Sequence, residues 1–216
     1  MHIGVIPDGN RRYCKKNKLQ LKEYTSLIIK NLFKFTREVI NGLDERYVNI
    51  LNEISEVSCY LASNKNLERA EASTFVPNLI KRIYSIYVDR KKYFTAKELK
   101  ILSTKLSILR IQFIGSPFNS EIDLILAECE RLTSQGDKLI SFAFNYDYKE
   151  KYECGDQTNI DLIVRPGYEK RLSGFFPLKS AYAELFFIDM LFPELTVQTI
   201  ETILKEYKKR NRRFGS

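Results

Sequence analysis

Clustered metal ligands are the first feature that this sequence lacks. It has a single histidine, His2, and its four cysteines lie far apart with no C-x-x-C pair. Zinc sites need cysteines and histidines at short spacings, so no zinc site is expected. The same scatter gives no disulfide framework, and we expect reduced thiols. The cysteines are Cys14, Cys59, Cys129 and Cys154.

Long apolar segments are also missing. No run approaches the ~20 residues that a membrane-spanning helix needs, and the richest stretch, residues 185–192, is interrupted by Asp189. The N-terminal MHIGVIPDG reaches a glycine-containing turn too early to leave room for a cleavable signal segment. We therefore expect a cytoplasmic protein that does not span a membrane.

The charge of the chain favours an anionic partner. Lys and Arg number 35 against 27 Asp and Glu, a formal net charge of +8, which attracts nucleic acid, anionic membranes or phosphorylated small molecules. The sequence has no zinc finger and no RNP-type aromatic string, so nucleic acid is disfavoured. The excess is concentrated in residues 11–22 and 205–213. The second of these segments is a candidate for peripheral contact with an anionic membrane.

Length and periodicity predict one α/β domain over residues 1–216. The chain can bury one substantial core, and apolar runs alternate with amphipathic stretches. This alternation favours a mostly parallel central sheet surrounded by helices, with ligands beyond the carboxyl ends of the strands. We expect strands at residues 2–6, 56–62, 109–114, 139–145 and 160–165. We expect helices at 25–41, 70–94, 120–134, 180–191 and 196–212, and an extra helical turn or a lid within 43–55.

The segment PDGNRR, which follows the first expected strand, has the residue types of a metal–phosphate site. Asp8 offers a hard oxygen ligand for Mg²⁺. Gly9 lets backbone N–H groups approach a ligand, and Arg11 or Arg12 can bind phosphate through two hydrogen bonds. Taken alone, the segment is more typical of an Asp-Gly turn with solvated arginines.

Two later segments add similar groups. Arg165, at the expected end of a strand, precedes a Pro-Gly turn, Arg171 and Ser173, and Glu184 in the next expected helix offers a second carboxylate. We expect Glu184 and Asp8 to converge on one metal-bridged pocket. The segment SNKNLER, residues 63–69, supplies hydrogen-bonding groups and one more arginine, although alone it would be interpreted as a loop.

In this order, these strings resemble the cis-prenyltransferase family, to which undecaprenyl and dehydrodolichyl diphosphate synthases belong. HIGVIPDGNRRY resembles the opening H-x-x-x-x-M-D-G-N-x-R-[WYF] of the family, and YLASNKNLERA resembles its Y-x-F-S-x-x-N-x-x-R-P segment. DLIVRPGYEKRLSGFFPLKSAYAELFF and the terminal RNRRFG resemble its later arginine-rich motifs. Four ordered matches that span most of the chain are far more specific than any one.

The resemblance implies roles for particular residues. Asp8 and Glu184 would hold Mg²⁺. The allylic diphosphate would be bound by Gly9, Asn10, Arg12 and Arg69, and the homoallylic diphosphate by Arg165, Arg171 and Ser173. Ser63 and Asn66 match residues that position substrate and assist proton removal, and Arg213 and Gly215 match a tail that reaches into the site of a partner subunit, which implies a homodimer. An apolar tunnel for the growing chain completes the implied fold.

The chemistry implied by the resemblance suits these residue types. Cleavage of the allylic carbon–oxygen bond places negative charge on the departing diphosphate, which guanidinium groups and Mg²⁺ stabilise. The allylic fragment gains carbocation character and needs a dry, apolar site. The proton released afterwards would be taken by Asp8 or by the diphosphate itself, and the sequence leaves both open.

Departures from the family pattern define the alternatives. Thr25 stands in place of the usual histidine and Tyr168 in place of a glycine, while Pro7, RPG and GFFPL resemble the lavandulyl-type branch, which couples two dimethylallyl units irregularly. A bulky Phe144 predicts a short product on steric grounds, with further filling of the tunnel by Phe75, Tyr84 and Tyr87. A non-catalytic partner subunit of a heterodimer is the remaining alternative, which the presence of Asp8, Glu184 and Arg213 disfavours.

Overall fold

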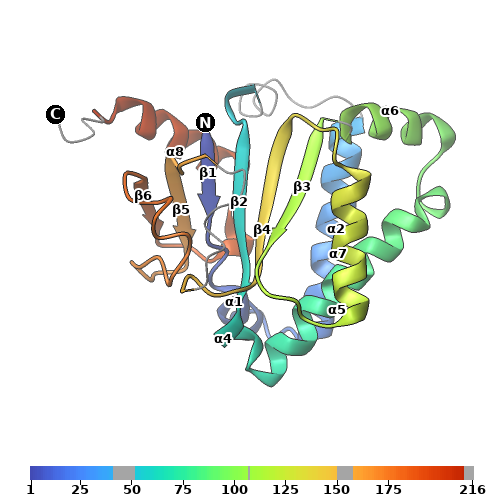
Figure 1. Ribbon diagram of the computed structural model, residues 1–216, viewed down its shortest axis with the longest axis horizontal. Helices are drawn as coiled ribbons and strands as arrows, with labels where there is room; N and C mark the ends of the chain where they lie inside the picture. The colour runs from blue at the N-terminus through green and yellow to red at the C-terminus, as the bar shows by residue number, and fades with distance from the viewer. Residues whose placement is uncertain (41–51, 107, 150–157, 212–216) are drawn as a thin grey trace.

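The computed structural model describes residues 1–40, 52–106, 108–149 and 158–211 (Figure 1). At its centre is a six-stranded sheet with the order β3-β4-β2-β1-β5-β6, in which every neighbouring pair is parallel. The strands are β1 (His2–Val5), β2 (Glu56–Ser63), β3 (Leu109–Ile114), β4 (Lys138–Tyr146), β5 (Leu162–Pro166) and β6 (Glu184–Ile188). The predicted α/β fold with a mostly parallel sheet is confirmed.

Helices cover both faces of this sheet, because its strands are apolar on both sides. On one face, Ile203 and Leu204 of α8 pack on Ile3, Leu162 and Val164. On the other face, α5 and α7 lie over the β3 end of the sheet, with α2 beside α5 and α6 beside α2 (Figure 1). The helices are α1 (Asn10–Lys16), α2 (Leu21–Ile40), α4 (Asn64–Leu67), α5 (Ala70–Val88), α6 (Ala96–Leu106), α7 (Ser120–Leu132) and α8 (Val197–Lys209), and the 3₁₀ turns are η1 (Arg90–Lys92) and η3 (Phe192–Glu194). Within the described ranges, none of these helices has both the length and the hydropathy needed to cross a bilayer.

All five predicted strands are present, and each ends within two residues of its expected bounds. The predicted helix over residues 180–191 is wrong, because this segment contains strand β6, paired with β5 from Leu162↔Glu184 to Pro166↔Ile188. The helix expected over residues 70–94 ends at Val88 and is followed by a 3₁₀ turn, and α6 was not expected. Most of the ambiguous segment 43–55 lies outside the described residues.

The parallel arrangement explains why the motifs meet. When all strands run in one direction, the segments that follow them emerge at the same edge of the sheet. The segment after β1 carries Asp8, β2 leads into α4, and the loop after β5 carries Gly167 and Arg171. These segments lie near α1 and α4 at the lower edge of the sheet in Figure 1.

Candidate active site

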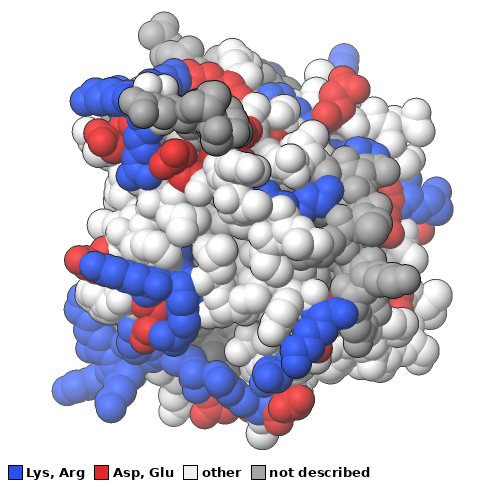
Figure 2. All heavy atoms as spheres, turned by 60° about the vertical axis from the view of Figure 1, so that its left-hand side comes forward, with Lys and Arg blue, Asp and Glu red and all other residues white. Residues whose placement is uncertain are grey.

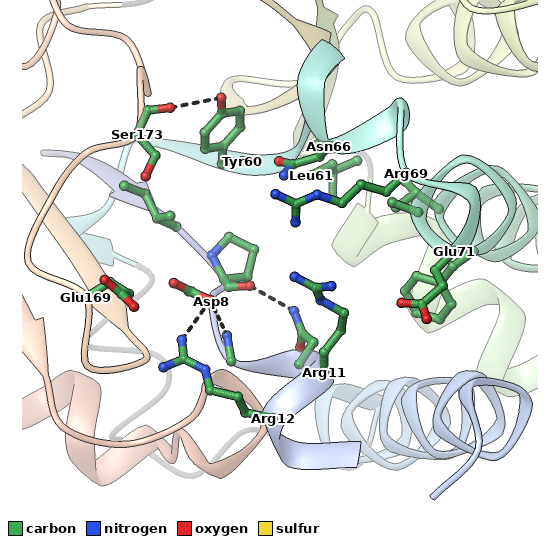
Figure 3. A pocket seen from close by; sticks show the side chains of 18 of the residues that line it. Asp8, Arg11, Arg12, Tyr60, Leu61, Asn66, Arg69, Glu71, Glu169 and Ser173 are labelled. Carbon is green, nitrogen blue, oxygen red and sulfur yellow. Dashed lines mark hydrogen bonds and ion pairs between the residues drawn. The ribbon is translucent and has the colours of Figure 1, made fainter. Parts of the chain in front are cut away.

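A pocket of about 610 Å³ opens at the carboxyl ends of β1, β2 and β5 (Figure 3). One part of its wall is polar and is built from the loop after β1, the start of α1 and the loop after β5. The other part is largely apolar and is built from β2, α2 and α5. The predicted residues that line it are Asp8, Gly9, Asn10, Arg11, Arg12, Asn66, Arg69, Arg165, Arg171 and Ser173.

Asp8 is held as a carboxylate at the centre of the polar part. Its Oδ2 accepts a hydrogen bond of 2.8 Å from Nη2 of Arg165, and its Oδ1 accepts one of 3.1 Å from Nη2 of Arg12 and one of 2.6 Å from the Gly9 N–H. Partial burial raises the pKa of Asp8, but the hydrogen bonds from Arg165 and Gly9 and the charge of Arg165 outweigh it, so the pKa lies below its ordinary value. Asp8 is therefore ionised at neutral pH.

Arg165 is the most deeply placed cation of the pocket. Its side chain is 4% exposed, at the end of the fully buried strand β5. Nη1 donates to Oγ of Ser173 at 2.9 Å and to the carbonyl oxygen of Arg171, whereas the buried Nε has no hydrogen-bond partner among the described residues. A buried donor without a partner is costly unless a ligand satisfies it. The residues after β1 and those at the end of β5 are thus joined by the hydrogen bond between Arg165 and Asp8.

Two glycines allow this close approach. Gly9 caps α1 with φ +100°, and a Cβ there would come within 2.8 Å of Leu191 Cδ2. Gly167 has φ +109°, and a Cβ there would lie 3.0 Å from Cβ of Asp8 and 3.1 Å from Nη2 of Arg12. Any larger residue would be strained in these backbone conformations, and at position 167 it would also crowd Asp8 and Arg12.

Positive charge dominates the polar wall. Arg11 and Arg69 extend toward each other across the pocket, opposite Asp8 (Figure 3). The lining contains five arginines, at positions 11, 12, 69, 165 and 171, against three acidic residues, at positions 8, 71 and 169. Figure 2 shows Lys and Arg side chains gathered over the lower part of the molecule, where the carboxyl ends of the strands lie. Such a wall binds a polyanion such as a diphosphate.

Asn66 and Asn10 are both held by local hydrogen bonds. Ser63 caps α4: its Oγ accepts from the Asn66 N–H at 3.0 Å, and its own N–H donates to Oδ1 of Asn66 at 3.2 Å. Ser63 itself is not part of the pocket wall and acts on the wall through Asn66. Asn10 donates from Nδ2 to the carbonyl oxygen of Pro7 at 2.8 Å.

Glu184 does not join Asp8 in the described chain, so the expectation that the two carboxylates converge is wrong for a single chain. Glu184 begins β6 at the level of Leu162 and Ile3, near the amino end of the sheet, whereas Asp8 lies beyond the carboxyl end of β1. Its Oε2 accepts a hydrogen bond of 2.7 Å from Nη1 of Arg210. The wrong helix assignment caused this error, because strand β6 fixes Glu184 at the opposite end of the sheet. Arg213 and Gly215 lie outside the described residues.

Sequence reasoning missed much of the apolar wall, which includes Tyr24, Tyr60 and Leu61. Burial raises the pKa of Tyr60, and its hydroxyl donates to the carbonyl oxygen of Ser173 at 3.3 Å. Phe75 lines the pocket as expected. Phe144, Tyr84 and Tyr87 are not among the lining residues, so they do not fill this cavity.

Comparisons with known proteins agree with the resemblance found in the sequence. Residues 148–215 match the family model described as "Putative undecaprenyl diphosphate synthase". An isoprenyl transferase of Treponema denticola is 28% identical over 100% of this chain and 97% of its own length. A tritrans,polycis-undecaprenyl-diphosphate synthase (geranylgeranyl-diphosphate specific) of Pyrobaculum aerophilum is also 28% identical, over 99% of this chain and 95% of its own length. The chain thus resembles isoprenyl transferases over its whole length, and its C-terminal part matches the undecaprenyl diphosphate synthase model.

A solved structure agrees with the cis-prenyltransferase fold. Lavandulyl diphosphate synthase from Lavandula x intermedia, crystallised with dimethylallyl diphosphate, has a TM-score of 0.75 and 18% sequence identity. The alignment covers 100% of this chain and 98% of the lavandulyl enzyme. At this identity the likeness establishes the fold alone.

Proposed function

We propose that this chain is a cis-prenyltransferase that condenses isopentenyl diphosphate with an allylic diphosphate and releases a short-chain prenyl diphosphate. The single observation that carries the proposal is the division of the pocket: arginines surround Asp8 on one wall, and Tyr60, Leu61 and Phe75 form another. A diphosphate head and an apolar isoprenoid tail have the same division of character.

The arginine wall suits the bond-breaking step. As the allylic carbon–oxygen bond lengthens, negative charge grows on the diphosphate oxygens. Fixed guanidinium groups therefore stabilise the transition state more strongly than the ground state. Arg11, Arg12 and Arg69 bind the allylic diphosphate in this proposal, with Gly9 and Asn10 as further contacts. Arg165, Arg171 and Ser173 bind the homoallylic diphosphate. The apolar wall excludes water from the carbon that gains positive charge.

The residues present fit one magnesium ion at Asp8. An ionised, partly exposed carboxylate is a hard oxygen ligand, and Mg²⁺ commonly combines one or two carboxylates with substrate phosphate oxygens. Among the described residues, no group of three or more His, Cys, Asp or Glu side chains could hold a metal without the substrate. When bound, the ion would neutralise charge on the leaving diphosphate. Addition of EDTA should abolish product formation, and Mg²⁺ should restore it.

Proton removal follows carbon–carbon bond formation. Asp8 is ionised and accepts hydrogen bonds from Arg12 and Arg165, which are proposed to bind the two diphosphates. It can therefore accept a proton directly or through the diphosphate. In this proposal Asn66, which is held by Ser63 and lines the pocket, orients the homoallylic substrate.

The size of the cavity supports a short product. Pockets of roughly 300–1,000 Å³ enclose one drug-sized ligand, and the volume of about 610 Å³ includes the space for the diphosphate groups. A product with many added isoprene units would exceed the remaining apolar volume.

Glu184 and the C-terminal tail bear on the oligomeric state. Because Glu184 does not reach Asp8 in one chain, its proposed role as a metal ligand requires the site of a partner subunit in a homodimer. Arg213 and Gly215 would enter the same partner site. Mixing Asp8→Ala chains with Arg213→Ala chains tests this: half of the dimers would be mixed, each with one intact site of two, restoring about a quarter of wild-type activity. No restoration would place the tail in its own chain's site.

The assay uses purified protein, Mg²⁺ and isopentenyl diphosphate with dimethylallyl, geranyl or farnesyl diphosphate. Product mass and double-bond geometry are measured. We expect short cis-prenyl diphosphates. A ladder of many added units would overturn the short-chain assignment, and a branched product from dimethylallyl diphosphate alone would establish the irregular, lavandulyl-type reaction instead. Absence of any product would favour the non-catalytic partner subunit.

A further inference from the structure

Tyr24 connects the two parts of the pocket wall. It lies on α2, is 3% exposed and lines the cavity. Its hydroxyl donates a hydrogen bond of 2.5 Å to Oδ1 of Asn10, which belongs to the polar wall. Its ring stacks on Phe75 of α5, with ring centroids 6.0 Å apart and planes inclined by 18°. The side chain of Tyr24 therefore contacts Asn10, a residue proposed to bind the diphosphate, at one end and the apolar wall at the other.

The face of α5 that lines the pocket changes from polar to apolar along the helix. Arg69 precedes the helix, and Ala72, Phe75 and Val76 follow at helical spacing on the same face. Six residues separate Arg69 from Phe75, which is about 9 Å along a helix axis at ~1.5 Å per residue. The stacked rings of Tyr24 and Phe75 therefore stand a short distance beyond the arginines, where an isoprenoid tail would extend.

Phe144 and Tyr84, two other aromatic residues, are not among the residues that line the cavity. Phe144 is 2% exposed and belongs to a core cluster with Ala62, Leu67 and Ile122. Tyr84 lies on α5, two and a half turns beyond Phe75, and is not a lining residue. The steric limit expected from Phe144 therefore does not act in this cavity.

We propose that the stacked Tyr24–Phe75 pair sets the length of the prenyl chain, and that the Tyr24 hydroxyl positions Asn10 for the allylic diphosphate. Phe75 and the ring of Tyr24 determine specificity, whereas the hydroxyl acts through Asn10 and is a positioning group. This inference rests on the proposed prenyltransferase function.

Two variants separate these roles. Phe75→Ala removes one ring of the stack and leaves the Tyr24–Asn10 hydrogen bond in place, so products should gain one or more isoprene units. Tyr24→Phe keeps the stack and removes the hydroxyl, so product length should be unchanged while KM for the allylic diphosphate rises about 5- to 20-fold, the effect of losing roughly one hydrogen bond. KM for isopentenyl diphosphate should change by less than about twofold.

Tyr84→Ala is the matched control, because it removes an aromatic ring from the same helix outside the cavity, and its product distribution should equal that of the wild type. Circular dichroism of each variant verifies folding, and Phe75→Leu replaces Phe75→Ala if the latter unfolds. Wild-type protein that makes no prenyl product would refute the proposed function. Active wild type with unchanged product length in both Phe75 variants would refute the length limit, and an unchanged allylic KM in Tyr24→Phe would refute the positioning role.

Discussion

Polar and charged side chains gather at both ends of the central sheet, but only those at one end are accessible to a ligand. At the carboxyl end, Asp8 and Arg165 lie in the wall of a large pocket, and the Arg165 Nε has no partner in the described structure. At the amino end, His2, Ser58 and Glu56 form a cluster whose residues are 2%, 0% and 5% exposed. The first group can meet a ligand, whereas the second is closed to solvent.

The amino-end cluster has the residue types of a hydrolase triad. The His2 Nδ1 lies 3.0 Å from the carbonyl oxygen of Thr158, to which it must donate, so Nε2 accepts from Oγ of Ser58 at 2.9 Å. Oε2 of Glu56 accepts from Oγ1 of Thr158 at 2.8 Å. These bonds join β1, β2 and the segment before β5. Both ends contain a buried polar atom without a hydrogen-bond partner in the described structure, Arg165 Nε at one and Glu56 Oε1 at the other. The comparison teaches that access, rather than residue types, distinguishes a reactive site from a structural one.

Replacing the buried arginine of the pocket should have the largest effect. Arg165→Met keeps much of the side-chain volume but removes the charge that faces Asp8 and Ser173, so kcat/KM should fall ~10²–10³-fold, as on loss of one transition-state hydrogen-bond donor. Steady-state kinetics with both substrates measures this. Arg131→Met is the control, since Arg131 is largely exposed and pairs only with Glu128 of its own helix in the described structure. Equal activity of the two variants would contradict a role for Arg165.

Removing the histidine at the closed end should affect stability and spare chemistry. His2→Ala leaves the Ser58 hydroxyl and the Thr158 carbonyl without partners in a buried site, so the free energy of unfolding should fall by ~2–4 kcal/mol. Ser58→Ala, which removes one hydrogen bond, should cost less, ~1 kcal/mol. Denaturant titration measures both, and kcat of the folded fraction should remain close to that of the wild type. A large loss of kcat without a loss of stability would assign the cluster a functional role.

Lowering the pH should reduce the free energy of unfolding through protonation of His2. Burial lowers the pKa of His2 below its ordinary value of 6.5, although the nearby carboxylates of Glu56 and Asp161 oppose the shift. The unfolded chain therefore binds a proton at His2 more readily than the folded chain does. The stabilisation is complete above pH 6.5 and is lost as the pH falls from 6.5 through the folded pKa. Thermal unfolding between pH 7 and pH 5 should show this slope at its full size in the wild type and reduced in His2→Gln.

The smallest predicted effect concerns the loop after β5. Tyr168 has φ +68°, a left-handed conformation that costs a non-glycine residue about 1–2 kcal/mol, and its ring lies 5.7 Å from the Arg12 guanidinium. Tyr168→Gly should therefore raise the free energy of unfolding by ~0.5–1 kcal/mol, because the entropy cost of glycine offsets part of the gain. KM for the allylic diphosphate should rise slightly as Arg12 loses its neighbour. Calorimetry measures the free energy of unfolding and steady-state kinetics measures KM. A less stable Tyr168→Gly variant would contradict backbone strain at Tyr168.

The sequence predicted most of the fold because buried parallel strands are nearly continuous apolar runs. The sequence of β6 favoured a helix because AYAELFFIDML contains Ala, Leu, Met and Glu, which are helix formers, whereas pairing with β5 along an edge of the sheet decides its structure. The residues predicted from the motifs around Asp8 and Arg165 meet in the polar wall because these motifs lie at the carboxyl ends of β1 and β5. The contact between Tyr24 and Phe75 joins two helices and has no local sequence pattern, so it could not be predicted.

The bond between Asp8 and Arg165 joins residues 157 positions apart. Strand β1, which precedes Asp8, can pair with β5 only after β2 to β4 have been synthesised. Sequence separations of this size slow folding, because the loop must close before the contact is gained. On the ribosome, the first strand and its acidic loop therefore cannot complete the pocket until β5 has been synthesised.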